Sequence, residues 1–233
     1  MGHGSARYPG AADALHAHAE TIRQDGRFAE VAVGLLTGGP SADDALSSLA
    51  AAEVRVVPFF MEDGYFTRVA VPRALSGHAT STRAPRLCPP VGTHPAIASV
   101  IARRAVSHCT AHGLDPKGVA LLLVGHGSAW VPGRRKAAHD HAERLAAQNR
   151  FGPVRVAFLE EPPFVPDTLA DLRGMRVAVL GLFAGDGGHV RDDLPAVIAA
   201  DQDAADTVLD LGIIGTDPAL AGIIMDQAGR PRS

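Results

Sequence analysis

Residues 119–128 read VALLLVGHGS, and this stretch decides the fold. Six consecutive apolar residues precede a Gly-His-Gly turn, a pattern typical of a strand buried on both faces of a parallel sheet. Three further apolar runs alternate with longer segments of helical periodicity: VRVAFLE at 154–160, RVAVLGLF at 176–183 and VLDLGII at 208–214. Strands that alternate with helices pair in parallel through right-handed crossovers. We therefore predict an α/β fold with a doubly wound, mostly parallel sheet flanked by helices.

The chain also repeats itself at a constant offset of 123 residues, which places His3 on His126. The matching segments keep one register without a gap: 1–20 with 124–143, 59–68 with 182–191, and 92–96 with 215–219. Internal repeats of this kind indicate a duplicated structural unit. We predict two tandem lobes of the same fold, a first copy over residues 1–115 and a second copy over residues 116–233.

The first copy follows the same plan through VAVGLLT at 31–37 and VRVVPFF at 54–60. Met1, however, aligns with Val124, the last apolar residue before the Gly-His-Gly turn of the second copy. The first copy therefore has no counterpart of the run VALLL. Either this strand is absent from the first lobe or the start of the chain is misassigned.

Composition excludes several classes of protein. The chain has 233 residues, 46% of them hydrophobic and 20% charged, which is ordinary for a soluble globular protein. A net charge of −3 gives no strong attraction to nucleic acid. The two cysteines fit neither a metal site nor a disulfide scaffold, and no apolar run is long enough for a membrane span. We expect a cytoplasmic monomer or homodimer that binds neither membrane nor nucleic acid.

Three polar side chains of the second copy stand where apolar strands end, namely His126, Glu160 and His189. The carboxyl ends of parallel strands meet at one edge of a sheet, so we expect these side chains to converge. Two imidazoles and a carboxylate suit a divalent ion such as Fe(II), Co(II), Ni(II) or Zn(II), and they also accept protons near neutral pH. We predict that all three are both metal ligands and catalytic groups.

The glycines beside the two histidines let the backbone turn sharply or approach a ligand closely. Ser128 stands near the start of the next predicted helix, where a helix cap is the alternative role. No phosphate-binding motif of the G-x-G-x-x-G or G-K-[ST] kind is present, which leaves a phosphoester-binding, flavodoxin-like enzyme weakly supported.

The runs LLLVGHGS, VAFLE and LFAGDGGHVRDDLPAV, in this order, resemble the sirohydrochlorin chelatases of the CbiX type, which insert cobalt or iron into a metal-free reduced tetrapyrrole. The resemblance covers the second copy nearly end to end and the first copy more faintly. It implies a two-lobed chelatase-like fold with the tetrapyrrole between the lobes. It also implies that the two metal-site histidines of the family correspond to His126 and His189, and that the family's glutamate corresponds to Glu160. The divalent metal, Co2+ or Fe2+ with Ni2+ as a further candidate, is then a substrate, and no organic cofactor is expected.

The first copy keeps His3 but has Thr37 at the position of Glu160 and Phe66 at the position of His189. We therefore place the metal site in the second copy and expect a degenerate site in the first. Because the first copy lacks two of these site residues, a second possible function is that of a non-catalytic carrier of tetrapyrrole or metal.

Cationic groups are expected near a substrate that carries eight carboxylates. Arg191 lies two residues after His189, and we assign it to tetrapyrrole binding together with Ser128 and Gly188. By contrast, we expect the basic run 134–136 to be a solvated helix face. The histidine pairs spaced by two residues on predicted helices are also expected at the surface: His16 with His18, and His139 with His141.

Overall fold

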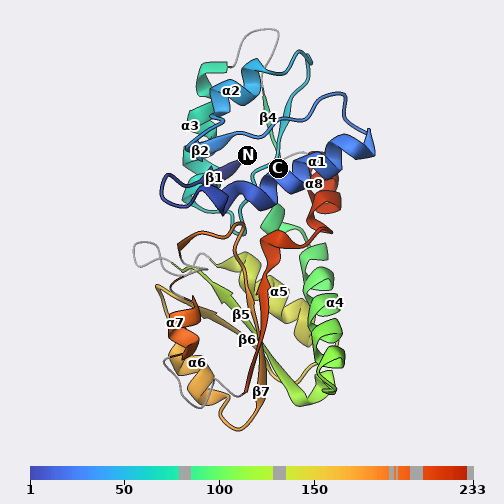
Figure 1. Ribbon diagram of the computed structural model, residues 1–233, viewed down its shortest axis with the longest axis vertical. Helices are drawn as coiled ribbons and strands as arrows, with labels where there is room; N and C mark the ends of the chain where they lie inside the picture. Colours follow the sequence, from blue (N-terminus) through green and yellow to red (C-terminus); the bar gives the residue numbers. More distant parts are fainter. Residues whose placement is uncertain (79–84, 128–134, 189–191, 193, 200–206, 230–233) are drawn as a thin grey trace. The chain divides into compact units, whose positions relative to one another are not determined.

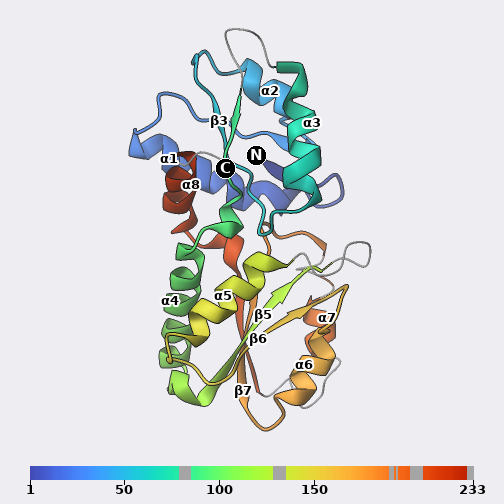
Figure 2. The same ribbon diagram turned by 180° about the vertical axis from the view of Figure 1, so that it is seen from behind.

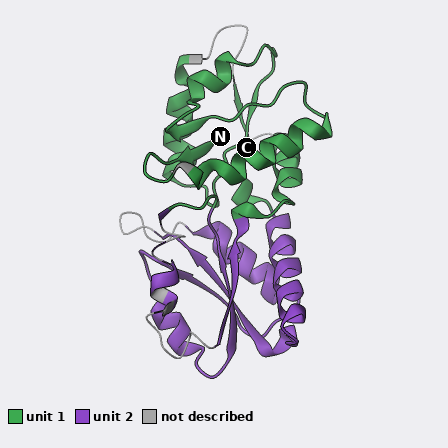
Figure 3. Cartoon of the chain, in the orientation of Figure 1, with its two compact units in different colours: residues 1–94, 184–187, 215–233 green, residues 95–183, 188–214 purple. Residues whose placement is uncertain are grey.

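The computed structural model describes residues 1–78, 85–127, 135–188, 192, 194–199 and 207–229 (Figure 1, and from behind in Figure 2). The chain folds into two compact units (Figure 3). Unit 1 contains residues 1–94, 184–187 and 215–233, and unit 2 contains residues 95–183 and 188–214. No helix among the described residues is long and apolar enough to cross a bilayer.

Unit 2 is built on a four-stranded parallel sheet with the strand order β6-β5-β7-β8. Its strands are β5 (Val119–Gly125), β6 (Val154–Phe158), β7 (Arg176–Gly181) and β8 (Val208–Ile213). Residues 119–124 of the central strand β5 are at most 1% exposed, as expected for a strand covered on both faces. The predicted doubly wound parallel sheet is confirmed in this unit.

Helices cover both faces of this sheet (Figures 1 and 2). One face carries α4 (Ala96–Ala111) and α5 (Lys136–Ala146), which pack together. The other carries α6 (Val165–Asp171) and α7 (Leu194–Ala199). Each helix begins after the carboxyl end of a strand or leads back to a strand's amino end, so the polar turns gather at one edge of the sheet.

Unit 1 follows the same plan with shorter strands. Two parallel pairs are formed, β1 (Gly2–Gly4) with β2 (Leu35–Thr37) and β3 (Arg55–Val56) with β4 (Arg86–Leu87). The helices of this unit are α1 (Asp13–Asp25), α2 (Ala42–Ser47), α3 (Val71–Leu75) and α8 (Leu220–Gly229). Within the unit, α1 packs on α8 and α2 packs on α3.

The two copies share one strand register. Gly2 pairs with Leu35 in unit 1, and the residues 123 positions later, Gly125 and Phe158, pair in unit 2. The same holds for the second pair of strands, where the partners are Arg55 with Arg86 and Ala178 with Leu209. A one-residue slip would reverse the buried face of a strand, so identical registers require the same pattern of inward-facing residues in both copies.

The compact units do not follow a single cut in the chain. Helix α4 ends the first copy in sequence but belongs to unit 2, whereas α8 ends the second copy and belongs to unit 1. Equivalent side chains hold both helices. Arg104 of α4 donates to the carbonyl of Ile213 at 2.7 Å, and Gln227 of α8 donates to the carbonyl of Pro90 at 2.8 Å. Each copy therefore provides the last helix of the other copy's unit.

Two histidines expected at the surface are buried. His18 and His141 occupy equivalent positions on α1 and α5, and each is only 3% exposed, whereas His16 and His139 are exposed as expected. His18 Nε2 lies 2.7 Å from the carbonyl oxygen of Gly215. Burial lowers the pKa of His18, and this effect outweighs the opposing contributions of Gly215 and Asp217.

This burial predicts a pH-dependent stability of unit 1. Below about pH 6.5, the ordinary imidazole pKa, the unfolded chain binds a proton at His18 that the folded chain does not yet bind. The free energy of unfolding should therefore decrease as the pH falls through 6.5, and level off below the lowered pKa. Urea unfolding at pH 7.5 and 5.5 measures this decrease, which His18→Gln should reduce. His16→Gln, an exposed change on the same helix, should leave it unaltered.

Candidate metal-binding site

His126 follows the last residue of β5 in a turn that requires glycine on both sides. A Cβ on Gly125 would lie 2.9 Å from Cδ1 of Phe158, and Gly127 has a φ of +81°. His126 Nδ1 lies 2.9 Å from the carbonyl oxygen of Gly127. Because a carbonyl only accepts, this contact favours the tautomer with the proton on Nδ1 and the lone pair on Nε2. The imidazole is thus prepared to bind a metal ion through Nε2.

Glu160 follows β6 and lies beside His126. Its backbone N–H donates to the carbonyl of His126 at 2.9 Å, and its Oε2 lies 3.6 Å from His126 Nδ1. The side chains of His126 and Glu160 are 41% and 43% exposed, so a ligand from solution can reach both. The structure therefore brings together two of the three predicted metal ligands at the carboxyl edge of the sheet.

The third predicted ligand, His189, lies outside the described residues, as do Ser128 and Arg191. Gly188 is described and half-buried, immediately before residues 189–191. Within the described part of the chain, no group of three or more His, Cys, Asp or Glu side chains could hold a metal ion. The three-ligand site therefore remains a prediction, of which His126 and Glu160 are the described part.

A buried ion pair next to the site was not predicted from the sequence. Arg135 Nε lies 2.6 Å from Oε1 of Glu161, with the two side chains 12% and 4% exposed. Arg135 was expected on a solvated face, but it precedes α5, which begins at Lys136, and turns inward to Glu161. This pair joins the start of α5 to the residue after Glu160. The sequence feature that could have indicated this pair is the doublet Glu160-Glu161. Glu160 is exposed, and Glu161 is buried.

The equivalent place in the first copy has only one of the three predicted ligands. His3 keeps the same turn, with Nδ1 2.8 Å from the carbonyl of Gly4. Phe66 stands where the second copy has His189, and its ring meets the His3 ring edge-on at a centroid distance of 4.7 Å. Phe66 also stacks on Phe60 at 5.6 Å, and it is 40% exposed. With Thr37 in place of Glu160, this position offers one imidazole and an aromatic surface.

The CbiX family model matches residues 1–108 and 120–230, the greater part of both copies. The chain belongs to the CbiX family. A relative in Halobacterium salinarum, described as a probable sirohydrochlorin cobaltochelatase, is 31% identical over 98% of this chain and 89% of its own.

Solved structures of related proteins have the same fold as this CbiX family member. The structure described as CbiX, the terminal enzyme for biosynthesis of siroheme in denitrifying bacteria, aligns with a TM-score of 0.77 and 27% identity over 100% of this chain and 97% of its own. The multi-domain protein DR2241 of Deinococcus radiodurans, reported to be structurally similar to chelatases, aligns with a TM-score of 0.83 and 26% identity. The match covers 99% of this chain but 54% of DR2241.

Removing the imidazole of His126 should weaken metal binding strongly. We expect His126→Ala to lower the affinity for Co2+ at least tenfold, and Glu160→Gln to lower it by a smaller factor, because each removes a donor from a small set. His3→Ala, the same change at the equivalent turn, should have little effect. Calorimetric titration of Co2+ into each variant measures the affinities. Equal losses of affinity for His3→Ala and His126→Ala would contradict the placement of the metal site in the second copy.

Breaking the buried ion pair should destabilise the fold. Glu161→Gln leaves the Arg135 guanidinium without its charged partner in a mostly buried position, and we expect a loss of roughly 3 kcal/mol in the free energy of unfolding. Lys136→Ala removes the neighbouring cation, whose side chain is 84% exposed and pairs with Asp140, and it should change stability little. Urea unfolding of the two variants provides the comparison, and a small loss for Glu161→Gln would argue that solvent reaches the pair.

Proposed function

We propose that this chain inserts a divalent metal ion, cobalt or iron, into sirohydrochlorin or a closely related reduced tetrapyrrole, as a step in cobalamin or siroheme biosynthesis. The observation that carries the proposal is the pair formed by His126 and Glu160 at the carboxyl edge of the unit 2 sheet, in the copy that also keeps His189. The names of the related proteins support the same substrate class.

The chemistry of insertion matches these groups. A divalent ion enters the macrocycle as two pyrrole N–H protons leave, so the site must hold the metal briefly and take up two protons. Two or three protein ligands leave coordination positions open for the macrocycle nitrogens, whereas a complete four-ligand cage would retain the metal. We assign His126 and His189 as metal ligands and proton acceptors, and Glu160 as a further ligand or proton relay.

In this proposal the first copy supplies no metal ligands. Its exposed apolar side chains gather near the degenerate site, where Tyr65 is 65% exposed, Phe66 40% and Val69 47%. Arg191, Ser128 and Gly188 would contact the substrate in the second copy, with Arg191 pairing with a carboxylate.

An anaerobic insertion assay tests the proposal. We expect multiple turnovers with excess Co2+ or Fe2+ and sirohydrochlorin. The absorbance change of the metallated product measures the rate, and Ni2+ is tested in parallel. His126→Ala and His189→Ala should each lower the rate by about a hundredfold, because each removes a ligand and a proton acceptor.

The control for this assay is His3→Ala, which should stay within a few-fold of the unmodified chain because His3 lacks the other two ligands. Tetrapyrrole binding, measured by absorbance titration, should survive in all three variants. Binding without turnover, at one equivalent per chain, would instead identify a carrier. A wild-type insertion rate for His189→Ala would contradict the proposed mechanism.

A further inference from the structure

The buried ion pair between Arg135 and Glu161 belongs to one copy of the repeat. Arg135 Nε lies 2.6 Å from Glu161 Oε1, and the two side chains are 12% and 4% exposed. The residues 123 positions earlier are Ala12 and Gly38, which carry no charge. The pair is therefore present in the copy that has the predicted metal ligands, and it has no charged counterpart in the copy with the degenerate site.

The fold itself does not require this pair. The first copy pairs its strands in the same register with Ala12 and Gly38 at these positions. Helices α1 and α5 also begin at equivalent places, directly after Ala12 and Arg135. Burying two charges is costly, and their attraction offsets this cost only in part, so a buried ion pair is weak evidence for a role in stability. Its presence in one copy points instead to the site beside it.

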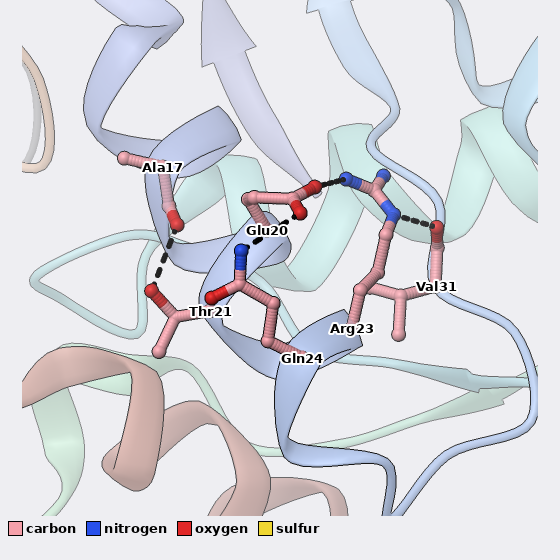
Figure 4. Close-up of polar contacts among 6 residues, drawn as sticks. All are labelled: Ala17, Glu20, Thr21, Arg23, Gln24 and Val31. Carbon is pink, nitrogen blue, oxygen red and sulfur yellow. Dashed lines mark hydrogen bonds and ion pairs between the residues drawn. The ribbon is translucent and has the colours of Figure 1, made fainter.

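An ion pair on the surface of α1 shows the contrast. Glu20 accepts from Arg23 at 3.1 Å, with side chains that are 56% and 43% exposed (Figure 4). Arg23 also donates to the carbonyl of Val31 at 3.1 Å. Water can replace contacts at such exposed positions, so this pair should contribute little. Water has far less access to Arg135 and Glu161, whose relative position is therefore fixed by the pair.

Glu161 lies against the turn that holds the metal-site imidazole. A Cβ on Gly127 would lie 3.0 Å from the backbone nitrogen of Glu161 and 3.1 Å from its Cγ. The carbonyl oxygen of Gly127 lies 2.9 Å from Nδ1 of His126. Arg135 thus fixes Glu161, Glu161 packs on Gly127, and Gly127 orients the imidazole.

The strand ladder next to this turn differs between the copies. In the first copy, the pairing of β1 with β2 continues to Gly4 and Thr37. Among the described residues of the second copy, the ladder of β5 with β6 ends two residues earlier. Gly127 and Glu160, the equivalents of the last pair of the first copy, therefore lie beyond the ladder.

Different atoms occupy the space beside the second glycine of the turn in the two copies. A Cβ on Gly4 would lie 2.0 Å from the carbonyl oxygen of Thr37, so the neighbouring backbone fills this space in the first copy. In the second copy the nearest atoms to such a Cβ on Gly127 belong to Glu161 and Phe158. The side chain of Glu161 thus stands where the backbone of the next strand would otherwise approach.

The shorter ladder changes which way the predicted ligands can point. Successive side chains along a strand point to opposite faces of the sheet, and residues paired across a parallel ladder share a face. If the ladder continued, Glu160 would share the face of Gly127 and point away from the His126 side chain. Beyond the ladder, Glu160 Oε2 lies 3.6 Å from His126 Nδ1.

We propose that Arg135 and Glu161 are positioning residues, which keep the ladder open after β5 and so hold the Glu160 carboxylate beside the His126 imidazole for metal binding. The inference rests on the proposed function, because it takes His126 and Glu160 as metal ligands. Arg135 and Glu161 act behind these ligands and do not bind the metal. Contacts of this kind commonly change metal affinity by about 10- to 100-fold.

The test gives the second copy the residues of the first. The double variant Arg135→Ala/Glu161→Gly removes both charges together, so neither is left buried without the other. We expect the affinity of the full chain for Co2+, measured by calorimetry, to fall about tenfold. The visible absorption bands of bound Co2+ should also change, because they report the geometry of its ligands. Glu161→Gln, which keeps the length of the side chain, should weaken binding by a smaller factor.

Two controls separate positioning from stability. Val177→Ala removes buried volume near the amino end of β7, away from the carboxyl edge, and it should lower the Tm without changing the affinity for Co2+. Glu20→Gln breaks the exposed pair on α1 and should change neither quantity. All variants are compared at a temperature at which circular dichroism shows them to be folded.

Unchanged affinity and an unchanged Co2+ spectrum in the double variant would overturn this proposal and leave the metal site of the proposed function intact. An equal loss of affinity in Val177→Ala would also overturn it, since metal binding would then follow stability. If the double variant does not fold, Glu161→Gln decides by the same two measurements. If the unmodified chain binds no Co2+, the metal site and this inference are both wrong.

Discussion

The burial of β5 on both faces, with a hydrogen-bonded neighbour on each edge, is the constraint on which unit 2 depends. A strand in this position can carry no polar side chain along its length, so its first polar residue stands where the strand ends. That residue is His126, and the pairing of β5 with β6 places Glu160 next to it. The site is thus a consequence of the sheet: the ladder that buries the apolar run also fixes the relative positions of imidazole and carboxylate.

Much of this arrangement could be predicted from residue patterns. The apolar runs marked the four strands of unit 2, and the offset of 123 residues predicted that the two copies follow the same fold. The proximity of His126 and Glu160 followed from the rule that parallel strands end at a common edge. These features depend on backbone periodicity, which a sequence displays directly. The position of His189 stays a prediction, because it lies outside the described residues.

Other features depend on contacts between distant segments, which periodicity does not reveal. His18 was expected at the surface because its neighbour His16 is two positions away, and only the packing of α1 shows which of the two faces inward. Arg135 belongs to a basic run typical of a solvated face, yet its partner Glu161 is brought close by the fold. The exchange of α4 and α8 between units was not predicted, because the apolar periodicity of a helix does not indicate which sheet it packs on.

This exchange determines how the chain can be divided. The path of the chain passes from one unit to the other at residues 94–95, 183–184, 187–188 and 214–215. A fragment that stops at the repeat boundary carries α4 but lacks α8, so the surface of α1 that packs on α8 would face water. The opposite fragment lacks the helix that Arg104 anchors to β8. The boundary between the two copies in the sequence therefore does not coincide with the boundary between the compact units.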